Sequence, residues 1–283
     1  MCRLFAFRSI EPVKPSDCLI NSNNSMLNQS IKNQDGWGIS YFSDGKSEVI
    51  KNIESAYVDK RFIRTSSEIT SNTILSHIRN ATQGKLDRYN TQPFKYKDWV
   101  FAHNGNLKNF PVIKKELISK IDKKLQKNIK GNTDSEVIFN ILLSKMNKFP
   151  CKNIKYPLMN LVEATRDTIN EIENYTGKIY QDENGSSQET YITFIITNGS
   201  LMLAHQGGKD IYYSQHRYSN ETTCLCSSNH TSIDSPKHII FSSEPIDNNN
   251  WEKLNPYEIV AVDYDFKIQS FKQMVSNEGL RIE

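Results

Sequence analysis

The order of hydrophobic patterns along the chain constrains its fold most, because segments typical of strands come first, helical segments follow, and strands return at the end. Short apolar or alternating segments in the first part predict strands at 2–8, 36–42, 47–52, 73–78 and 99–103. In the last part they predict strands at 190–197, 201–205, 210–215, 238–242, 258–262 and 267–271. We therefore expect an α+β fold in which helices pack on antiparallel sheets.

The middle of the chain predicts helices. Over 113–129, apolar residues recur every four positions, which is typical of a helix with one buried face. Residues 133–136 (Thr-Asp-Ser-Glu) have the spacing of a capping box, so a helix is expected to begin there and to run through 137–143. Further helices are expected at 16–31, with Ser16 as the N-cap, and at 158–175.

Length and composition narrow the classes of protein. The 283 residues suffice for one large domain or two small ones, and we expect a single domain over 2–283. A formal net charge of +3 is too small to predict binding to nucleic acid or to a membrane surface. No segment approaches the roughly 18 apolar residues of a membrane span, and the first residues do not resemble a signal peptide. The five scattered cysteines indicate a reducing cytoplasm without disulfides.

Cys2 directly follows the initiator methionine, and its small side chain permits aminopeptidase removal of Met1. The mature chain would then carry a thiol and a free α-amine on one residue. The thiolate is the reactive form of cysteine, and free thiols titrate near ~8.5. An α-amine titrates near ~7.7–8.0, so it can accept and return a proton near neutrality. A nucleophile and a base are thus combined, as in enzymes with an N-terminal threonine, although many chains begin Met-Cys without consequence.

Three polar segments carry further candidate residues, each with a structural alternative. Arg79 follows a predicted strand, and its planar fork of donors suits either a substrate carboxylate or a structural ion pair. Asn104 offers an amide donor and Gly105 lets a backbone N–H approach closely, so the pair can form an oxyanion hole or simply a turn. Asp134, in the first turn of a helix, can hold an ammonium group or complement the helix dipole.

Taken together, these segments match a known pattern. After the N-terminal Cys2 come, in order, His-x-Arg-x-Ala-Thr at 77–82, His-Asn-Gly-x-Leu at 103–107 and Thr-Asp-Ser-Glu at 133–136. This set resembles the class II glutamine amidotransferase domain, from Cys2 to about residue 265. Asp-Gly-Trp-Gly-Ile at 35–39 and Ser-Ser-Glu-Pro at 242–245 resemble its stand-alone members, which lack a fused synthase. The resemblance implies a four-layer αββα sandwich of the N-terminal nucleophile hydrolase type.

The resemblance also implies a reaction. Cys2 is expected to attack the γ-amide carbonyl of glutamine or of a γ-glutamyl compound, with its own α-amine as the base. The Asn104 side chain and the Gly105 backbone N–H are expected to bind the oxyanion. Water would then hydrolyse the γ-glutamyl thioester. No cofactor is implied.

For the substrate's amino acid head group, the resemblance assigns the α-carboxylate to Arg79 and the α-ammonium to Asp134. Thr82 is expected to line the same pocket. His77 and His103 lie beside these motifs, and we interpret both as packed or hydrogen-bonding residues rather than as bases.

Two positions depart from the family pattern. Gln83 stands where some members have a histidine after the Ala-Thr pair. Gln92, followed by Pro93 and Phe94, stands where many members have the histidine of a His-Pro-Phe segment. We expect both to affect the choice of leaving group more than catalysis. Cys224 and Cys226, with His230 nearby, do not have the spacing of a common zinc site, so no metal is expected.

The resemblance leaves the physiological reaction open. The chain can be a γ-glutamyl amide hydrolase, which we favour, or a glutaminase subunit that delivers ammonia to a separate synthase. A catalytically silent glutamine sensor is the non-enzymatic alternative. The expected partners are therefore a small-molecule substrate and, in the second case, a synthase subunit.

Overall fold

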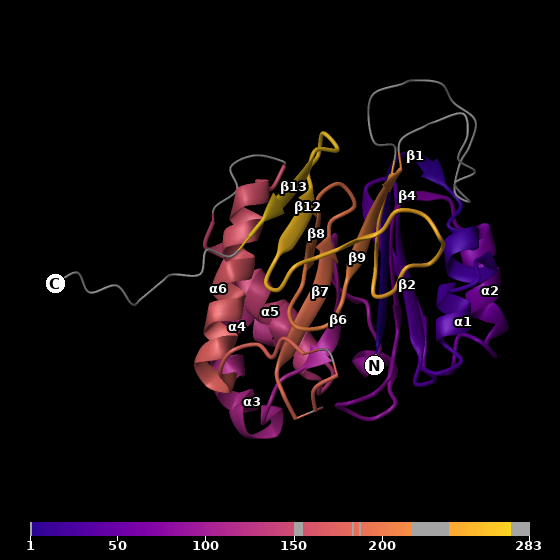
Figure 1. The fold of residues 1–283 in the computed structure, drawn as a ribbon. Coiled ribbons are helices and arrows are strands. Elements are labelled where there is room, and N and C mark those ends of the chain that lie inside the picture. Colours follow the sequence, from indigo (N-terminus) through magenta and orange to yellow (C-terminus); the bar gives the residue numbers. More distant parts are fainter. Residues whose placement is uncertain (1, 150–154, 183, 187, 217–237, 273–283) are drawn as a thin grey trace.

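The computed structural model of this chain describes residues 2–149, 155–182, 184–186, 188–216 and 238–272. Two antiparallel sheets lie face to face, and helices cover the outer face of each sheet (Figure 1). From left to right in that view, the layers are helices, a six-stranded sheet, a seven-stranded sheet and helices. The expected α+β fold, a four-layer αββα sandwich, is therefore confirmed.

The seven-stranded sheet has the order β11-β9-β10-β1-β4-β2-β3, with the N-terminal strand at its centre. Its strands are β1 (Arg3–Val13), β2 (Trp37–Ser43), β3 (Lys46–Asn52), β4 (Ser71–Ile78), β9 (Tyr212–His216), β10 (His238–Ser242) and β11 (Glu252–Lys253). A π-helical turn (Asp17–Asn21), α1 (Met26–Gln29) and α2 (Lys60–Glu68) cover its outer face. Phe5 and Phe7 pack there in one apolar cluster with Trp37 and with Phe62 of α2.

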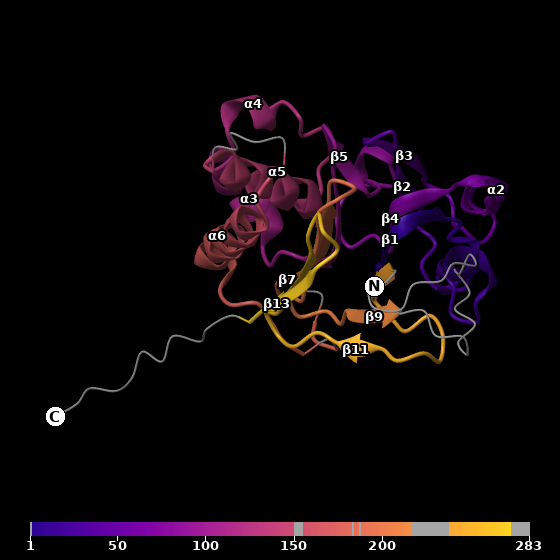
Figure 2. The same cartoon turned by 90° about the horizontal axis from the view of Figure 1, so that it is seen from above.

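The six-stranded sheet has the order β13-β12-β8-β7-β6-β5. Its strands are β5 (Phe94–Tyr96), β6 (Trp99–Asn106), β7 (Tyr191–Thr197), β8 (Met202–His205), β12 (Ile259–Val262) and β13 (Ile268–Phe271). The helices on its outer face are α3 (Phe110–Ser119), α4 (Lys123–Gln126), α5 (Asp134–Asn147) and α6 (Leu158–Thr176), all on one side in Figure 2. Phe101 of β6 stacks on Phe139 of α5 with ring centroids 5.1 Å apart, which fixes β6 against the helix that carries Asp134.

A separate apolar core fills the space between the two sheets. Leu4 and Leu75 enter it from the seven-stranded sheet, and Val100 and Ala102 enter it from the six-stranded sheet. Because side chains alternate along a strand, residues at even spacing from these four also face the inter-sheet space. This alternation decides which polar side chains can meet at the ends of β1, β4 and β6.

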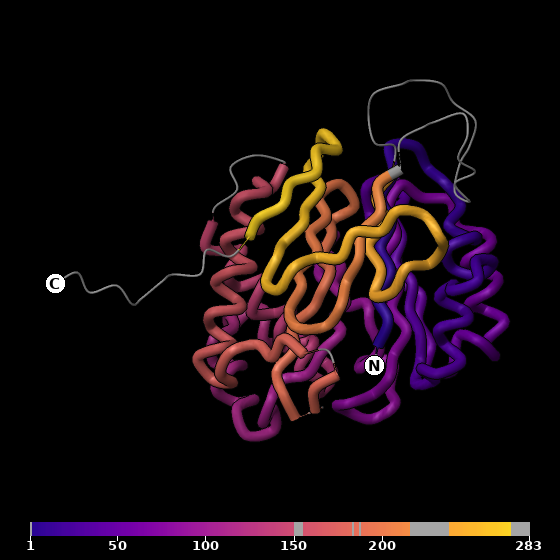
Figure 3. The backbone as a smooth tube through the Cα atoms, viewed as in Figure 1, coloured from indigo at the N-terminus to yellow at the C-terminus, as the bar shows by residue number. Residues whose placement is uncertain are grey.

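The last part of the chain joins the two sheets. After β10 the chain adds β11 at the edge of the seven-stranded sheet and then crosses to β12 of the six-stranded sheet through residues 254–258 (Figure 3). Leu254 of this segment lies in the inter-sheet core, and its N–H donates to the Ile211 carbonyl at 3.0 Å. The crossing segment therefore contributes packing to the core rather than only connecting two strands.

Most of the predicted elements are present, with bounds that differ at one or both ends. The predicted strands correspond to β1–β4, β6–β10, β12 and β13, and the helices predicted at 133–143 and 158–175 correspond to α5 and α6. β6 runs to Asn106, so Asn104 and Gly105 lie inside a strand and not in a turn. Four short elements were not predicted from the sequence: α2, β5, β11 and a 3₁₀ helix at Arg88–Asn90.

Two helix predictions are wrong. The helix expected over 16–31 is two short turns, because the Ser25 side chain caps α1 by accepting the Asn28 N–H, whereas Ser16 makes no side-chain cap. The helix expected over 113–129 is divided into α3 and α4, because Asp122 has extended backbone and its N–H donates to Ser144 Oγ at 2.9 Å. The four-residue apolar spacing there reflects burial rather than one continuous helix.

Candidate active site

The Cys2 side chain lies directly before β1, against the backbone of Asn80. Its thiol donates to the Asn80 carbonyl, and the Asn80 N–H donates to Cys2 Sγ, both at 3.3 Å. Burial raises the pKa of the Cys2 thiol, while the Asn80 N–H and the charge of Arg79 act in the opposite direction. The thiol therefore needs a base to become nucleophilic at neutral pH, and the Asn80 N–H is placed to stabilise the thiolate.

The backbone of residues 79–81, which contacts the thiol, is held by residues 35–36, directly before β2. The Arg79 N–H donates to the Gly36 carbonyl at 2.8 Å, and the Asp35 N–H donates to the Arg79 carbonyl at 3.1 Å. The Asp35 carboxylate accepts the Ala81 N–H at 2.7 Å. The backbone of Asn80 is therefore held on both sides. Sequence analysis did not assign a role to Asp35, although it begins the Asp-Gly-Trp-Gly motif.

Cys2 and Asn104 face the same space between the sheets. Cys2 is two residues before Leu4, and Asn104 is two residues after Ala102, and both of these apolar residues lie in the inter-sheet core. β1 pairs with β4 so that Arg3 lies opposite Ile78, which brings Cys2 beside Arg79. β6 contacts both β1 and β4 across the inter-sheet space. The ends of three strands thus bring a thiol, a guanidinium and a carboxamide together.

Asn104 and Gly105 have the properties expected of oxyanion donors. Asn104 is 4% exposed, and its side-chain amide has no hydrogen-bond partner in the part of the chain that the structure describes. Gly105 lies opposite Ile192, and a Cβ atom there would lie 2.1 Å from the Tyr191 carbonyl oxygen and 2.4 Å from His103 Nε2. Only glycine fits this position without displacing β7.

Asp134 is the first residue of α5, and its side chain is buried. One carboxylate oxygen accepts the Leu107 N–H at 2.8 Å, and the other accepts the Ser135 N–H at 2.8 Å. Thr133 caps the helix, but the Glu136 carboxylate bonds to the preceding loop rather than completing the capping box. Because a carboxylate has about four acceptor positions, Asp134 can anchor β6 and still accept a further donor.

The Arg79 guanidinium binds the loop that follows it. It donates to the carbonyls of Gln83 at 3.0 Å, Gly84 at 3.4 Å and Lys85 at 3.2 Å. Burial lowers the pKa of Arg79, but arginine remains charged throughout the physiological range. Backbone carbonyls are weaker partners than a carboxylate, so this arrangement leaves Arg79 able to bind an anion.

Comparison with known proteins identifies the family of this chain. The family model for class-II glutamine amidotransferases matches residues 1–275. The chain belongs to this family. Its relatives include a Saccharomyces cerevisiae protein named "Probable glutamine amidotransferase DUG3", which is 28% identical over 224 residues. This match covers 72% of the present chain and 62% of the yeast protein, so the chain spans about three fifths of that relative's length.

Solved structures support the fold of this class II glutamine amidotransferase. A glutamine aminotransferase class-II domain protein from Silicibacter pomeroyi superposes with a TM-score of 0.63 at 18% identity, covering 95% of this chain and 98% of that chain. The glutamine phosphoribosylpyrophosphate amidotransferase of B. subtilis superposes with a TM-score of 0.59 at 15% identity, covering 96% of this chain and 49% of that one. These identities are low, so the likeness concerns the fold.

The loop after Arg79 holds two more of the predicted residues. Thr82 is exposed on this loop, apart from the buried groups. Gln83 reaches across the site, and its Nε2 donates to Asn106 Oδ1 at 3.1 Å, while Asn106 Nδ2 donates to the Glu189 carbonyl at 3.2 Å. Sequence analysis did not single out Asn106, although its place two residues after Asn104 puts it on the same face of β6.

The two histidines beside the motifs are buried and bonded or packed as expected. His103 Nε2 lies 3.1 Å from the Tyr191 carbonyl, and its Nδ1 lies 2.9 Å from Ser135 Oγ. Burial lowers the pKa of His103, and it lowers the pKa of His77 to about 3. Both rings are therefore neutral at pH 7, which agrees with their interpretation as structural residues.

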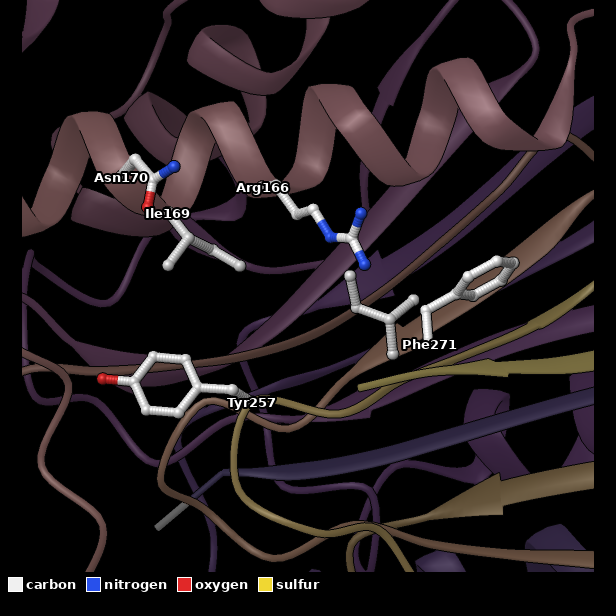
Figure 4. Close-up of a pocket in the computed structure, with 6 residues that line it drawn as sticks. Arg166, Ile169, Asn170, Tyr257 and Phe271 are labelled. Atoms are coloured by element: carbon white, nitrogen blue, oxygen red, sulfur yellow. The ribbon is translucent and has the colours of Figure 1, made fainter. Parts of the chain in front are cut away.

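The close-up in Figure 4 shows a cavity elsewhere, between α6 and the β12–β13 region. Arg166 and Asn170 line it from α6, Phe271 lines it from β13, and Tyr257 lines it from the turn before β12. Ile259 in its wall belongs to the core between the sheet and the helices. The six-stranded sheet thus separates this cavity from Cys2, and it is not the substrate pocket.

The described ranges contain no group of three or more histidine, cysteine or acidic side chains that could hold a metal ion. Cys224, Cys226 and His230 lie outside the described residues. In the same ranges, no helix combines the length and the apolar character that a membrane span requires.

Proposed function

We propose that the mature chain, a single domain over 2–283 without Met1, cleaves the γ-amide bond of glutamine or of a γ-glutamyl compound through a thioester on Cys2. The observation that carries this proposal is the convergence of Cys2, Arg79 and Asn104 at one end of the inter-sheet space, beside Asp134. Membership of the class-II glutamine amidotransferases supports it.

Removal of Met1 is the first requirement. In the full-length chain the Cys2 nitrogen is an amide, which does not accept a proton. In the mature chain the same nitrogen is an amine that titrates near ~7.7–8.0 and can take the thiol proton, directly or through one water. Because burial raises the pKa of the Cys2 thiol, this base is needed for reaction near neutral pH.

Acyl transfer then proceeds in two steps. The Cys2 thiolate attacks the γ-carbonyl carbon, and the oxyanion forms hydrogen bonds with the Asn104 side-chain amide and the Gly105 N–H. The C–N bond breaks as the proton held by the α-amine passes to the leaving nitrogen, which departs as ammonia or an amine. Water, activated by the freed α-amine, attacks the thioester, releases the γ-carboxylate product and restores the thiol.

Arg79 and Asp134 select the amino acid head group. A zwitterionic α-amino acid needs one cationic and one anionic partner, and these two side chains provide them. The Arg79 guanidinium would exchange its bonds to the carbonyls of residues 83–85 for the α-carboxylate. Asp134 would accept the α-ammonium with its remaining lone pairs, and Thr82 would line the pocket from the loop.

The test measures ammonia and glutamate release from L-glutamine, and amine release from a panel of γ-glutamyl amides and peptides. The protein must have a verified Cys2 amino terminus, and Cys2→Ala is the comparison. Turnover that is lost in Cys2→Ala is expected. Turnover of γ-glutamyl amides above that of glutamine supports a hydrolase, whereas ammonia release stimulated by a separate synthase supports a glutaminase subunit. Binding of glutamine without turnover would contradict the proposal.

A further inference from the structure

Gln92 continues the pairing between β5 and β6 in an unusual way. β5 pairs with β6 in antiparallel register, so that Phe94 lies opposite Phe101. Extending this register by two residues places Gln92 opposite His103. Here the side chain makes the ladder bonds that a backbone would make: Gln92 Oε1 accepts the His103 N–H at 2.6 Å, and Gln92 Nε2 donates to the His103 carbonyl at 3.1 Å.

The backbone of Gln92 lies against β2 instead. A Cβ atom on Gly38 would lie 2.1 Å from the Gln92 carbonyl oxygen and 2.8 Å from Pro93 Cδ. Lys51, which lies opposite Gly38 on β3, donates from its Nζ to the Thr91 carbonyl at 2.6 Å. The segment 91–93 is therefore fixed to the seven-stranded sheet, while the Gln92 side chain reaches β6 of the other sheet.

The orientation of the Gln92 amide is determined by its partners. The His103 N–H can only donate and the His103 carbonyl can only accept, so Oε1 and Nε2 cannot be exchanged. Nε2 also donates to Ser135 Oγ at 3.3 Å. The neutral His103 donates its Nε2–H to the Tyr191 carbonyl, so its Nδ1 accepts the Ser135 hydroxyl proton. These bonds join neutral groups and do not depend on pH near neutrality.

The residues proposed to bind the oxyanion lie between two such attachments. At His103 the strand is held by Gln92, and at Leu107 it is held by Asp134, which accepts the Leu107 N–H at 2.8 Å. Asn104 and Gly105 lie between these two points. Gly105 also lies at the strand edge where β5 has ended, and the Gln92 side chain takes the place of the neighbouring strand two residues before it, at His103.

We propose that Gln92 is a positioning residue of the oxyanion hole: its side-chain amide replaces a strand rung at His103 and so sets the place of Asn104 and the Gly105 N–H. This inference rests on the proposed function, because it concerns the same acyl transfer. Under this inference, Gln92 affects the rate of acyl transfer rather than the choice of leaving group.

The first test compares Gln92→Ala with wild type on the best substrate of the panel. The expected result is a fall in kcat of about 10- to 100-fold with KM changed by less than about threefold, because misplaced donors affect the transition state and not the head group. Gln126→Ala is the matched control, since Gln126 Nε2 donates to the carbonyls of Ile118 and Ile121 far from Cys2. Its kcat is expected to equal that of wild type.

A second variant keeps the inference testable if Gln92→Ala is poorly folded. In Gln92→Glu, one oxygen of an ionised carboxylate accepts the His103 N–H. The second oxygen faces the His103 carbonyl, and because both are acceptors this hydrogen bond is lost. When protonated, the carboxyl group donates to that carbonyl and restores the arrangement. Burial raises the pKa of such a group, so the ratio of Gln92→Glu to wild-type kcat is expected to rise at least about fivefold from about pH 8 to about pH 6.

The outcomes separate this inference from the proposed function. If wild type lacks Cys2-dependent turnover, the proposed function fails. If wild type is active while Gln92→Ala changes KM and leaves kcat unchanged, or while the Gln92→Glu ratio is independent of pH, Gln92 is not a positioning residue. A kcat loss in Gln126→Ala as large as that in Gln92→Ala would also overturn the inference, because the effect would then be general destabilisation.

Discussion

The two sides of the site differ in how they are held. On the side formed by β6 and α5, Asn104 is 4% exposed and Asp134 is 2% exposed, and neighbouring backbone groups are fixed by Gln92 and Asp134. On the other side, the loop 81–90 is largely exposed, with Leu86 at 55% and Tyr89 at 57%, and its attachments include the bonds to Arg79, from Gln83 to Asn106, and from the Asn132 N–H to Asn90.

This difference separates bond cleavage from the choice of leaving group. The groups proposed to stabilise the oxyanion lie where packing permits little movement. Thr82 and Gln83, expected to line the pocket and to affect the leaving group, lie on the exposed loop, where substitutions cost little stability. Arg79 and Asp134, proposed to bind the head group, are buried. Within one chain, the reaction can therefore stay the same while the preferred γ-glutamyl substrate changes.

Replacing the nucleophile is expected to have the largest effect. Cys2→Ala removes the group proposed to form the thioester, so turnover should fall below detection while the fold is retained. Cys2→Ser keeps a weaker nucleophile and should retain at most about one thousandth of the rate. Ammonia release measures both, and substantial turnover in Cys2→Ala would refute the assignment.

Asn104→Ala tests the buried side directly. Loss of one oxyanion donor typically lowers kcat by about 10²- to 10³-fold, and KM should change little because the ground state does not need this donor. Steady-state kinetics give both constants. Asn128→Ala, which removes the hydrogen bond that Asn128 Nδ2 donates to Asn140 Oδ1, is a matched control with unchanged kcat expected. An Asn104→Ala effect confined to KM would contradict the assigned role.

Asp134→Asn tests a residue of the buried side that has two proposed roles. Asp134 holds β6 through the Leu107 N–H, and it is proposed to bind the head group of the substrate. The variant loses the charge that would bind the α-ammonium and weakens the acceptor for the Leu107 N–H. We expect kcat/KM to fall about 100-fold, with both constants affected, and Tm to decrease by several degrees. Kinetics combined with thermal unfolding measure this, and an unchanged KM would remove Asp134 from the substrate site.

Acid is expected to lower the free energy of unfolding through histidines buried in the interior. Burial lowers the pKa of His77 to about 3 and that of His205 to about 4, so the folded state binds fewer protons than the unfolded state below about pH 6.5. Stability is therefore complete above about pH 6.5 and is lost as pH falls, by up to about 1.4 kcal/mol per pH unit for each histidine. Urea unfolding at a series of pH values measures the slope, and a His205→Gln variant should reduce it.

Gln83→Ala should have the smallest effect. It removes the bond from the exposed loop to Asn106, which lies on the same face of β6 as Asn104. We expect kcat for the best substrate to change by less than about threefold, while the ranking of γ-glutamyl substrates changes. Competition assays with pairs of substrates would detect this. A large loss of kcat on every substrate would place Gln83 with the buried groups instead.

The sequence predicts much of the fold and the identity of the candidate residues, but not how they are supported. Periodicity located most strands and the two long helices, and motif order pointed to Cys2, Arg79, Asn104 and Asp134. Periodicity failed at 113–129, because Asp122 pairs with Ser144 across two helices and local spacing carries no information about that bond.

The supporting bonds depend on contacts between segments distant in the chain. Gln92 was interpreted as a residue that affects specificity, but its side chain lies opposite His103 only because of the β5–β6 register. Asp35 likewise acts through Ala81, which is brought close by the pairing of β2 with β4. Neither contact has a local sequence signal, so both required the structure.

The most direct measurement of the central claim is the mass of the protein during turnover. Protein with Met1 removed is mixed with the best substrate, quenched in acid within one turnover, and digested to isolate the N-terminal peptide. The account predicts that this peptide gains the mass of one γ-glutamyl group at Cys2, and that the adduct decays to free thiol and product. Turnover without any adduct on Cys2, or an adduct on another cysteine, would contradict it.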